Sequence, residues 1–274
     1  MPDYIEPFGF IMLRVLGAAV LFWTISLFVK SEKIQRRDWS RIIACALFGM
    51  VINMLFFFKG LSLSTPINSS VIVTISPILV FILSAILIRE KITWLKASGA
   101  ILGLIGALML IFFSTSSTSE APNIPLGNLF ILINATSYGL YLIVVRPLTT
   151  RYKSITLMKW FFLIAVIINF PVTITEFTAV NWTSLPFSAV WRMGFVVVGV
   201  TFLTYLLNIY ALKELSASTI GVFVYLQPVI AISFAIISGA DQLTFIKAFA
   251  VVLVFTGVYL VSSRRSRIRR KNEE

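Results

Sequence analysis

Histidine is absent from this 274-residue sequence, and cysteine occurs once, at Cys45. The absence of histidine excludes metal centres and catalytic sites that depend on an imidazole. A single cysteine excludes a disulfide within the chain, because a disulfide joins two cysteines. Charged residues make up only 12% of the sequence, whereas a soluble domain carries roughly 25%. The composition therefore argues against a soluble protein.

Motifs of common enzymes are also missing. The sequence has no HExxH, no GxSxG and no pair of aspartates inside an apolar run. Such motifs would supply a zinc site, a nucleophilic serine or an intramembrane acid pair. We therefore expect no enzyme, no cofactor and no metal site. Gly99, Gly103 and Gly106 follow no strand, so they are not a nucleotide-binding loop, and their spacing instead favours close helix packing.

Long apolar runs dominate what is present, since 58% of the residues are hydrophobic. A membrane-spanning helix needs about 20 mostly apolar residues. The runs are continuous and do not alternate with period two, which indicates helices rather than strands. We predict an all-α integral membrane protein with about nine transmembrane helices, at residues 9–29, 42–60, 67–88, 95–113, 127–147, 155–176, 190–211, 217–238 and 243–262.

Lysine and arginine gather on one side of these predicted helices. The net charge is +12, and six of the 23 basic residues lie at 264–271. The loops on one side carry 18 basic residues, and those on the other side carry two, Lys59 and Lys247. By the positive-inside rule the C-terminus is cytoplasmic, so with nine helices the N-terminus of this chain is outside. The same pattern indicates a lipid bilayer, and not nucleic acid, as the partner.

The second half of the sequence repeats the first at a constant offset of 151 residues. Apolar matches would mean little in such a chain, but polar residues, prolines and glycines also keep register. This indicates a tandem duplication. The matching pairs are Pro77 and Pro228, Glu90 and Asp241, Thr93 and Thr244, Lys96 and Lys247, Gly106 and Gly257.

The repeats predict the domain organisation. Residues 1–113 form a first repeat of four helices and residues 127–262 a second repeat of five. A Ser/Thr/Pro-rich linker at 114–126 joins them, and a basic cytoplasmic tail follows at 263–274. The helix at 127–147 has no partner in the first repeat. A five-helix unit copied in tandem inserts upside down because five is odd, which predicts inverted repeats.

The pattern P-x12-E-K-I-T-x2-K-x2-G-x6-G at 77–106, with its weaker copy at 228–257, resembles the EamA family of the drug/metabolite transporter superfamily. The stretches LFFFKGLSLSTPINSSVIVTISP and LLNIYALKELSASTIGVFVYLQP strengthen the resemblance, which covers about residues 9–262. It implies ten helices with both ends cytoplasmic. This chain departs from that pattern, because the helix that would come first in the family is missing.

The resemblance also implies a function. We expect a permease or exporter in the bacterial inner membrane that moves small metabolites, amino acids or drug-like molecules by alternating access between two inverted repeats. Proton or counter-substrate coupling and a homodimer stay open. The alternatives are a nucleotide-sugar or triose-phosphate type antiporter of the same superfamily, a channel or scaffold, and an inactive truncated transporter.

Polar and aromatic side chains inside apolar runs are the candidate binding residues. Such groups are costly against lipid and tolerable against a wet cavity, which we expect near the midplane between the repeats. Interhelical hydrogen bonds are the alternative reading for each of them. The candidates for the substrate cavity are Asn53, Thr74, Asn134, Tyr138, Tyr141, Asn208, Tyr225 and Gln227.

Prolines and isolated charges complete the candidate set. Pro77 and Pro228 lie within apolar runs, where each predicts a helix kink, either for transport or for packing alone. Arg14 and Lys59 are candidate charged contacts, although either could extend to the membrane surface. At Glu90, capping a helix or fixing the loop is favoured over proton coupling.

Overall fold

The computed structural model describes residues 4–29, 32–90, 92–113, 122–237, 239 and 242–262. Within these ranges the regular secondary structure is helical, with no strand, and nine helices are long and apolar enough to cross a membrane. This confirms the all-α membrane fold. Lipid offers no hydrogen-bond partners, so each apolar run satisfies its backbone groups internally as a helix.

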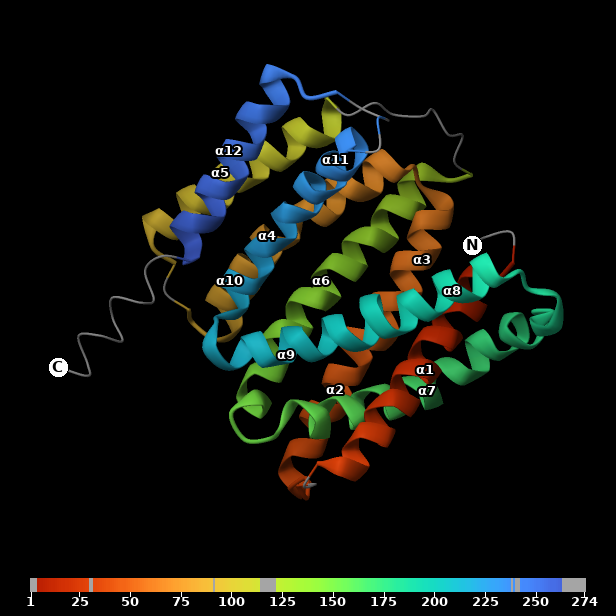
Figure 1. Cartoon of the computed structure of the whole chain (residues 1–274). Helices are drawn as coiled ribbons and strands as arrows, with labels where there is room; N and C mark the ends of the chain where they lie inside the picture. The colour runs from red at the N-terminus through yellow and green to blue at the C-terminus, as the bar shows by residue number, and fades with distance from the viewer. Residues whose placement is uncertain are drawn as a thin grey trace. The chain divides into compact units, whose positions relative to one another are not determined.

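Figure 1 shows these helices in chain order. The first repeat contains α1 (Pro7–Phe28), η1 (Arg36–Asp38), α2 (Trp39–Ala46), η2 (Leu47–Ile52), α3 (Asn53–Leu63), α4 (Pro66–Leu87) and α5 (Trp94–Phe112). The second contains α6 (Ile124–Thr149), α7 (Ser154–Thr178), η3 (Trp182–Ser184), α8 (Phe187–Phe195), η4 (Val196–Leu203), α9 (Thr204–Glu214), α10 (Ala217–Val222), η5 (Phe223–Tyr225), α11 (Leu226–Ile237) and α12 (Phe245–Ser262).

One boundary differs from the expectation, and two predicted segments lie partly or wholly where the structure gives no comparison. Helix α6 begins at Ile124, inside the predicted linker, because the apolar run continues upstream of Gly127. Residues 114–121 of that linker and the predicted tail at 263–274 lie outside the described residues.

The helices pack into two compact units that do not follow the repeats. Unit 1 comprises Met1–Ser62 and Leu140–Leu215, and unit 2 comprises Leu63–Gly139 and Ser216–Glu274. Each unit therefore takes helices from both repeats. Its core forms where equivalent helices of the two copies meet.

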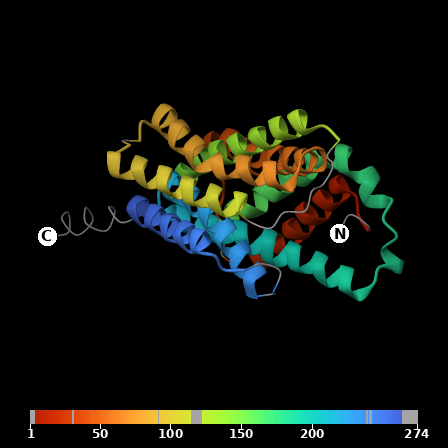
Figure 2. The ribbon, with the colours of Figure 1, turned by 90° about the horizontal axis from the view of Figure 1, so that it is seen from above.

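The core of unit 2 is the pair α5 and α12, which lie side by side in both ribbon views, in yellow and blue (Figure 1, Figure 2). A Cβ atom added to Gly106 would lie 2.7 Å from the carbonyl oxygen of Ala250, and one added to Gly257 would lie 2.5 Å from that of Gly99. These are the same contact made twice, since an offset of 151 maps Gly106 onto Gly257 and Gly99 onto Ala250. The two copies are thus related locally by a pseudo-twofold axis.

These contacts also give the direction of the two helices. Along α5 the order is Gly99 then Gly106, while the residues opposite them in α12 run from Gly257 back to Ala250. Equivalent helices of the two repeats are therefore antiparallel, as inverted repeats require. The glycine spacing was predicted to permit close packing, and the α5–α12 contacts confirm it.

The core of unit 1 is the equivalent pair α1 and α7. Aromatic rings fill this interface: Phe22 lies 5.3 Å from Phe162, and Trp23 lies 5.5 Å from Trp160, between ring centroids. Near the other end of the pair, the carboxylate of Glu176 in α7 accepts hydrogen bonds from two backbone N–H groups of the first turn of α1. The pair is again antiparallel.

Helix starts repeat at the same offset. The hydroxyl oxygens of Thr65 and Ser216 accept the N-cap hydrogen bonds of α4 and α10. Those of Thr93 and Thr244 accept from the first turns of α5 and α12. Threonine and serine suit these positions because they satisfy N–H groups that a helix leaves unpaired. The threonine of the family-like motif is therefore a helix cap.

Candidate functional site

Unit 1 contains two segments of π-helix, which sequence reasoning did not predict. They are η2 and η4, and shifting Leu47–Ile52 by 151 residues places it inside Val196–Leu203. Wide turns of this kind are rare and are frequent at functional sites. Both repeats therefore carry the same irregularity at the same place.

Hydroxyl groups satisfy the backbone at these wide turns. The hydroxyl of Thr201 donates to the carbonyl oxygen of Val196 at 2.9 Å, and that of Thr204 donates to Gly199 at 3.1 Å, each five residues back. The phenol of Tyr205 donates to the carbonyl oxygen of Gly49 in η2 at 2.9 Å. These side-chain hydroxyls thus supply hydrogen bonds to backbone carbonyl oxygens at the wide turns, where the main chain satisfies such groups less well.

Arg14 lies against one of these segments. Its Nε donates to the hydroxyl oxygen of Thr201 at 2.9 Å, and its guanidinium carbon lies 5.5 Å from the ring centroid of Phe58. Thr201 is fully buried. The hydrogen bond therefore directs the arginine into unit 1 and not along α1 toward its end.

A charge at this depth is costly. Arg14 is the eighth residue of α1, and insertion measurements put an arginine at the centre of a spanning helix at about 3 kcal/mol. Two ion pairs lie among the described residues, Lys96–Glu90 and Arg151–Asp38, and neither involves Arg14. A neutral hydroxyl and an aromatic face offset only part of this cost. Because a charge inside a spanning helix is costly, such a cation is a candidate functional residue.

The other basic residues of unit 1 are accommodated differently. Lys59 is exposed near the end of α3, with its ammonium 5.9 Å from the ring centroid of Phe8, as expected of a side chain that extends to the surface. Lys159 is buried, with its ammonium 5.1 Å from the ring centroid of Trp23. Of the two charged candidates predicted from sequence, Arg14 has the surroundings of a binding group.

The predicted cavity residues divide between the units. Asn53, Tyr141 and Asn208 belong to unit 1, and the other five belong to unit 2. Asn53, Asn208 and Tyr138 are partly buried, Asn134 is buried and Gln227 is exposed. The cavity itself stays a prediction.

Two of these tyrosines pack against glycines. A Cβ atom on Gly49 would lie 2.5 Å from the ring of Tyr141, and one on Gly103 would lie 2.4 Å from the ring of Tyr225. Both tyrosines are fully buried. The hydroxyl of Thr74 bonds back to the carbonyl oxygen of Ser70 in its own helix. These three side chains therefore have roles in packing or in backbone satisfaction.

The two prolines occupy different backbone settings. Pro77 lies inside α4, which continues as an α-helix on both sides of it. Pro228 lies in the first turn of α11, directly after the 3-10 turn η5. A proline removes one helical hydrogen bond, so the interruption at η5 is the expected accommodation at Pro228.

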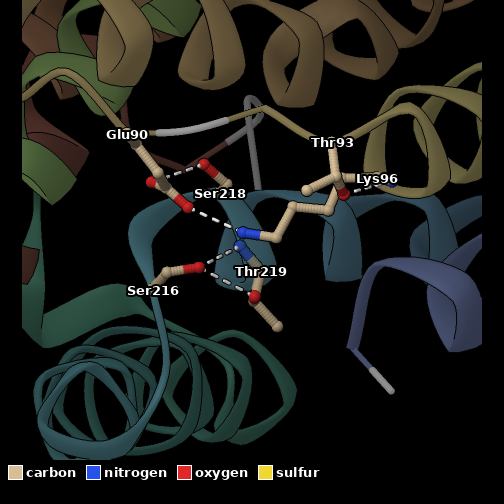
Figure 3. A network of polar contacts seen from close by, with 6 residues as sticks. All are labelled: Glu90, Thr93, Lys96, Ser216, Ser218 and Thr219. Carbon is tan, nitrogen blue, oxygen red and sulfur yellow. Dashed lines mark hydrogen bonds and ion pairs between the residues drawn. The ribbon is translucent and has the colours of Figure 1, made fainter. Parts of the chain in front are cut away.

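Unit 2 contains a polar network at the end of α4 (Figure 3). Glu90 accepts from the ammonium of Lys96 at 2.8 Å and from the hydroxyl of Ser218 at 3.0 Å. Lys96 lies in the first turn of α5, and Ser218 in that of α10. Glu90 thus ties the loop of one repeat to a helix start of the other, which supports fixing the loop as its role.

In the second copy of this loop the described residues also include a lysine contact. The ammonium of Lys247 donates to the carbonyl oxygen of Gln242 at 3.0 Å. Asp241, the equivalent of Glu90, lies outside the described residues. The position equivalent to Ser218 is Ile67, which has no hydroxyl. The second copy of this loop therefore has no serine at the position equivalent to Ser218.

Comparison with known families decides the identity. The EamA-like transporter family matches residues 1–112 and 125–263. The chain belongs to this family. The resemblance seen in the motif at 77–106 is thereby confirmed, and the EamA protein described here is an integral, multi-pass membrane protein.

Individual relatives agree with this assignment. An uncharacterized transporter of Archaeoglobus fulgidus is 26% identical to this EamA protein over 96% of the chain and 91% of the relative. The uncharacterized transporter YyaM of Bacillus subtilis is 26% identical over 94% of the chain and 85% of the relative. A solved crystal structure matches with a TM-score of 0.77 at 20% identity, over 96% of this chain and 90% of the other. Family membership favours a transporter over an enzyme.

Proposed function

We propose that this EamA protein is a permease of the bacterial inner membrane that moves small metabolites or drug-like solutes by alternating access between its inverted repeats. The observation that carries the proposal is the reciprocal contact in unit 2, where Gly106 meets Ala250 and Gly257 meets Gly99. Antiparallel copies of one fold can exchange roles, which turns one open side into the other.

Transport in proteoliposomes tests this proposal. Purified protein would be reconstituted and supplied with a panel of labelled amino acids, carboxylates, amides and amines. Alternating access predicts saturable uptake that the same solute inside the vesicle accelerates, because the loaded carrier reorients in both directions. Uptake that stays linear in solute concentration, together with ionic current across a planar bilayer, would indicate a channel instead.

We also propose that the loop at 30–41 faces the cytoplasm and the loop at 177–189 faces outside, on the distribution of lysine and arginine. The single cysteine makes the test simple, since Cys45→Ala leaves a cysteine-free background. In that background Thr183→Cys should react with an impermeant maleimide in intact cells, and Arg37→Cys only after permeabilisation. The opposite pattern would reverse the orientation.

A further inference from the structure

We propose that Arg14 binds the carboxylate of a monoanionic solute. This rests on the proposed transport function and names its substrate class. The carrying observation is a cation inside a spanning helix, fixed by Thr201 and Phe58 and paired with no protein carboxylate among the described residues.

The geometry leaves the binding end of the arginine available. A guanidinium has five N–H donors, and the bond to Thr201 uses the one on Nε. The four donors on the two terminal nitrogens form the flat fork that matches both oxygens of a carboxylate. Arg14 also keeps part of its surface accessible. The guanidinium is therefore fixed through Nε, while its four terminal N–H donors remain available to bind a carboxylate.

Its two neighbours hold it in complementary ways. Thr201 gives its own proton to the carbonyl oxygen of Val196, so its hydroxyl oxygen is oriented to accept from Arg14. Phe58 offers the negative face of its ring to the guanidinium and takes no donor from it. The wide turn of η4 and the end of α3 together preorganise the cation.

Three carboxylates of unit 1 accept hydrogen bonds from groups other than Arg14. Asp38 accepts from the guanidinium of Arg151 and the phenol of Tyr152. Glu176 accepts from the first turn of α1, and Glu32 accepts from the backbone of Lys153. These three are committed to other donors, and neither ion pair seen among the described residues involves Arg14.

One cation favours a monoanion. A phosphate dianion is normally bound by several cationic or N–H groups, whereas the contacts seen for two lysines of unit 1 are with aromatic rings: Lys59 lies over Phe8 and Lys159 over Trp23. A carboxylate matches both the charge and the shape of a single guanidinium.

Matched pairs of solutes test the assignment. Proteoliposomes would be offered benzoate against benzamide and hexanoate against hexanamide, with inorganic phosphate as a third anion. For the wild type we expect at least one carboxylate to be preferred over its amide by about 10- to 100-fold, the range for a charge-assisted hydrogen bond. Arg14→Met should abolish that preference, and Arg14→Lys should retain part of it.

Arg192→Met is the matched control, because Arg192 is an exposed cation of α8 in the same unit. It should keep the wild-type preference. Thr201→Val, which removes the hydroxyl that fixes Arg14, should lower the preference without abolishing it. An unchanged carboxylate preference in Arg14→Met, at wild-type amounts of folded protein, would overturn the proposal. So would preferred uptake of phosphate, which would indicate a different site.

A measurement on the wild type covers the case in which the variants do not fold. Phenylglyoxal modifies arginine, and mass spectrometry can follow the peptide that contains Arg14. A saturating carboxylate should slow modification of Arg14 several-fold and leave Arg192 unchanged. Equal modification with and without every carboxylate of the panel would refute the assignment.

The outcomes also separate this inference from the proposed function. Saturable exchange of neutral solutes with no carboxylate preference would keep the transporter and remove the role of Arg14. Protection of Arg14 by a carboxylate that is not transported would keep the binding site and remove the permease.

Discussion

The pairs α5–α12 and α1–α7 are equivalent in the two repeats, but different side chains lie at their interfaces. In unit 2 the pair closes on glycine, so that the backbones of α5 and α12 meet. In unit 1 aromatic rings pack between the helices at one end of the pair, and π-helices, an arginine and a carboxylate cap lie beside it. Both pairs meet closely, since a Cβ on Gly9 of α1 would lie 3.0 Å from the backbone of Glu176 in α7, but the α1–α7 pair also includes aromatic and charged side chains.

This difference indicates which part of a duplicated membrane protein can hold a functional site. Without a hydrophobic force between helices in lipid, close van der Waals contact stabilises α5 against α12. That contact leaves no space for a solute. Unit 1 contains the two π-helical segments, and Arg14 lies within a spanning helix of that unit.

The largest expected effect is at the glycine contact. Gly257→Val would add a branched side chain at a position where even a Cβ atom would lie 2.5 Å from a backbone oxygen. The backbone cannot move aside as easily as the end of a flexible side chain can. We expect loss of most folded protein, measured as the monodisperse peak in size-exclusion chromatography. Gly194→Ala is the control, because a Cβ there has no neighbour within 4 Å. A normal peak for Gly257→Val would mean that this interface is not close-packed.

The next effect is at the polar network of unit 2. Glu90→Ala leaves the Lys96 ammonium, whose side chain is 19% exposed, without its carboxylate, and removes the acceptor of Ser218. We expect a loss of about 1–2 kcal/mol, reduced from the value for a buried pair because solvent screens it. A double-mutant cycle with Lys96→Met, followed by thermal unfolding, measures the coupling. Additive effects would show that the pair contributes nothing.

Two buried tyrosines sharpen the comparison between the units. Tyr205→Phe in unit 1 removes a hydrogen bond to the carbonyl oxygen of Gly49 and should cost about 1 kcal/mol. Tyr225→Phe in unit 2 should cost nothing or stabilise, because its buried hydroxyl has no partner among the described residues. Thermal unfolding of both variants is the measurement. If Tyr225→Phe keeps its stability but loses transport, Tyr225 contacts the solute as the sequence suggested.

The smallest expected effect is at the helix cap of unit 1. Glu176→Gln keeps an oxygen that can accept from Phe8 and Gly9 but removes the negative charge beside the start of α1. We expect a loss of about 0.5 kcal/mol, the size of a charge–dipole interaction at a helix end. It should shrink at high salt. A loss that salt does not alter would indicate lost packing instead.

Much of the fold was predictable from the sequence because lipid imposes simple rules. A run of apolar residues must become a helix, so each predicted range matches an observed span closely, the largest difference being the second span, which begins at Arg36 and not at residue 42. The register of polar residues at an offset of 151 predicted the antiparallel repeats. The glycines at 99, 103 and 106 predicted a close contact, although not its partner helix.

The candidate site was much less predictable. Arg14 could be singled out because it is a cation in an apolar run, but its partner Thr201 lies 187 residues away. The π-helices left no signal, since in a continuously apolar segment the pattern of residues does not reveal the number per turn. The sequence could not show that the rings of Tyr141 and Tyr225 pack against Gly49 and Gly103, and their assignment to the cavity stays a prediction.

The reciprocal contact of α5 and α12 has the form of an isologous dimer interface, in which residue i meets residue j and the copy of j meets the copy of i. A true dimer must repeat every residue about its twofold axis, so an arginine such as Arg14 would come with a second cation. Fusion of the two copies removes that obligation. The position equivalent to Arg14 is Ala165, the one equivalent to Thr201 is Met50, and the one equivalent to Phe58 is Ile209. One chain can therefore carry a single charge in a symmetric scaffold, and a site with one charge can distinguish one end of a solute from the other.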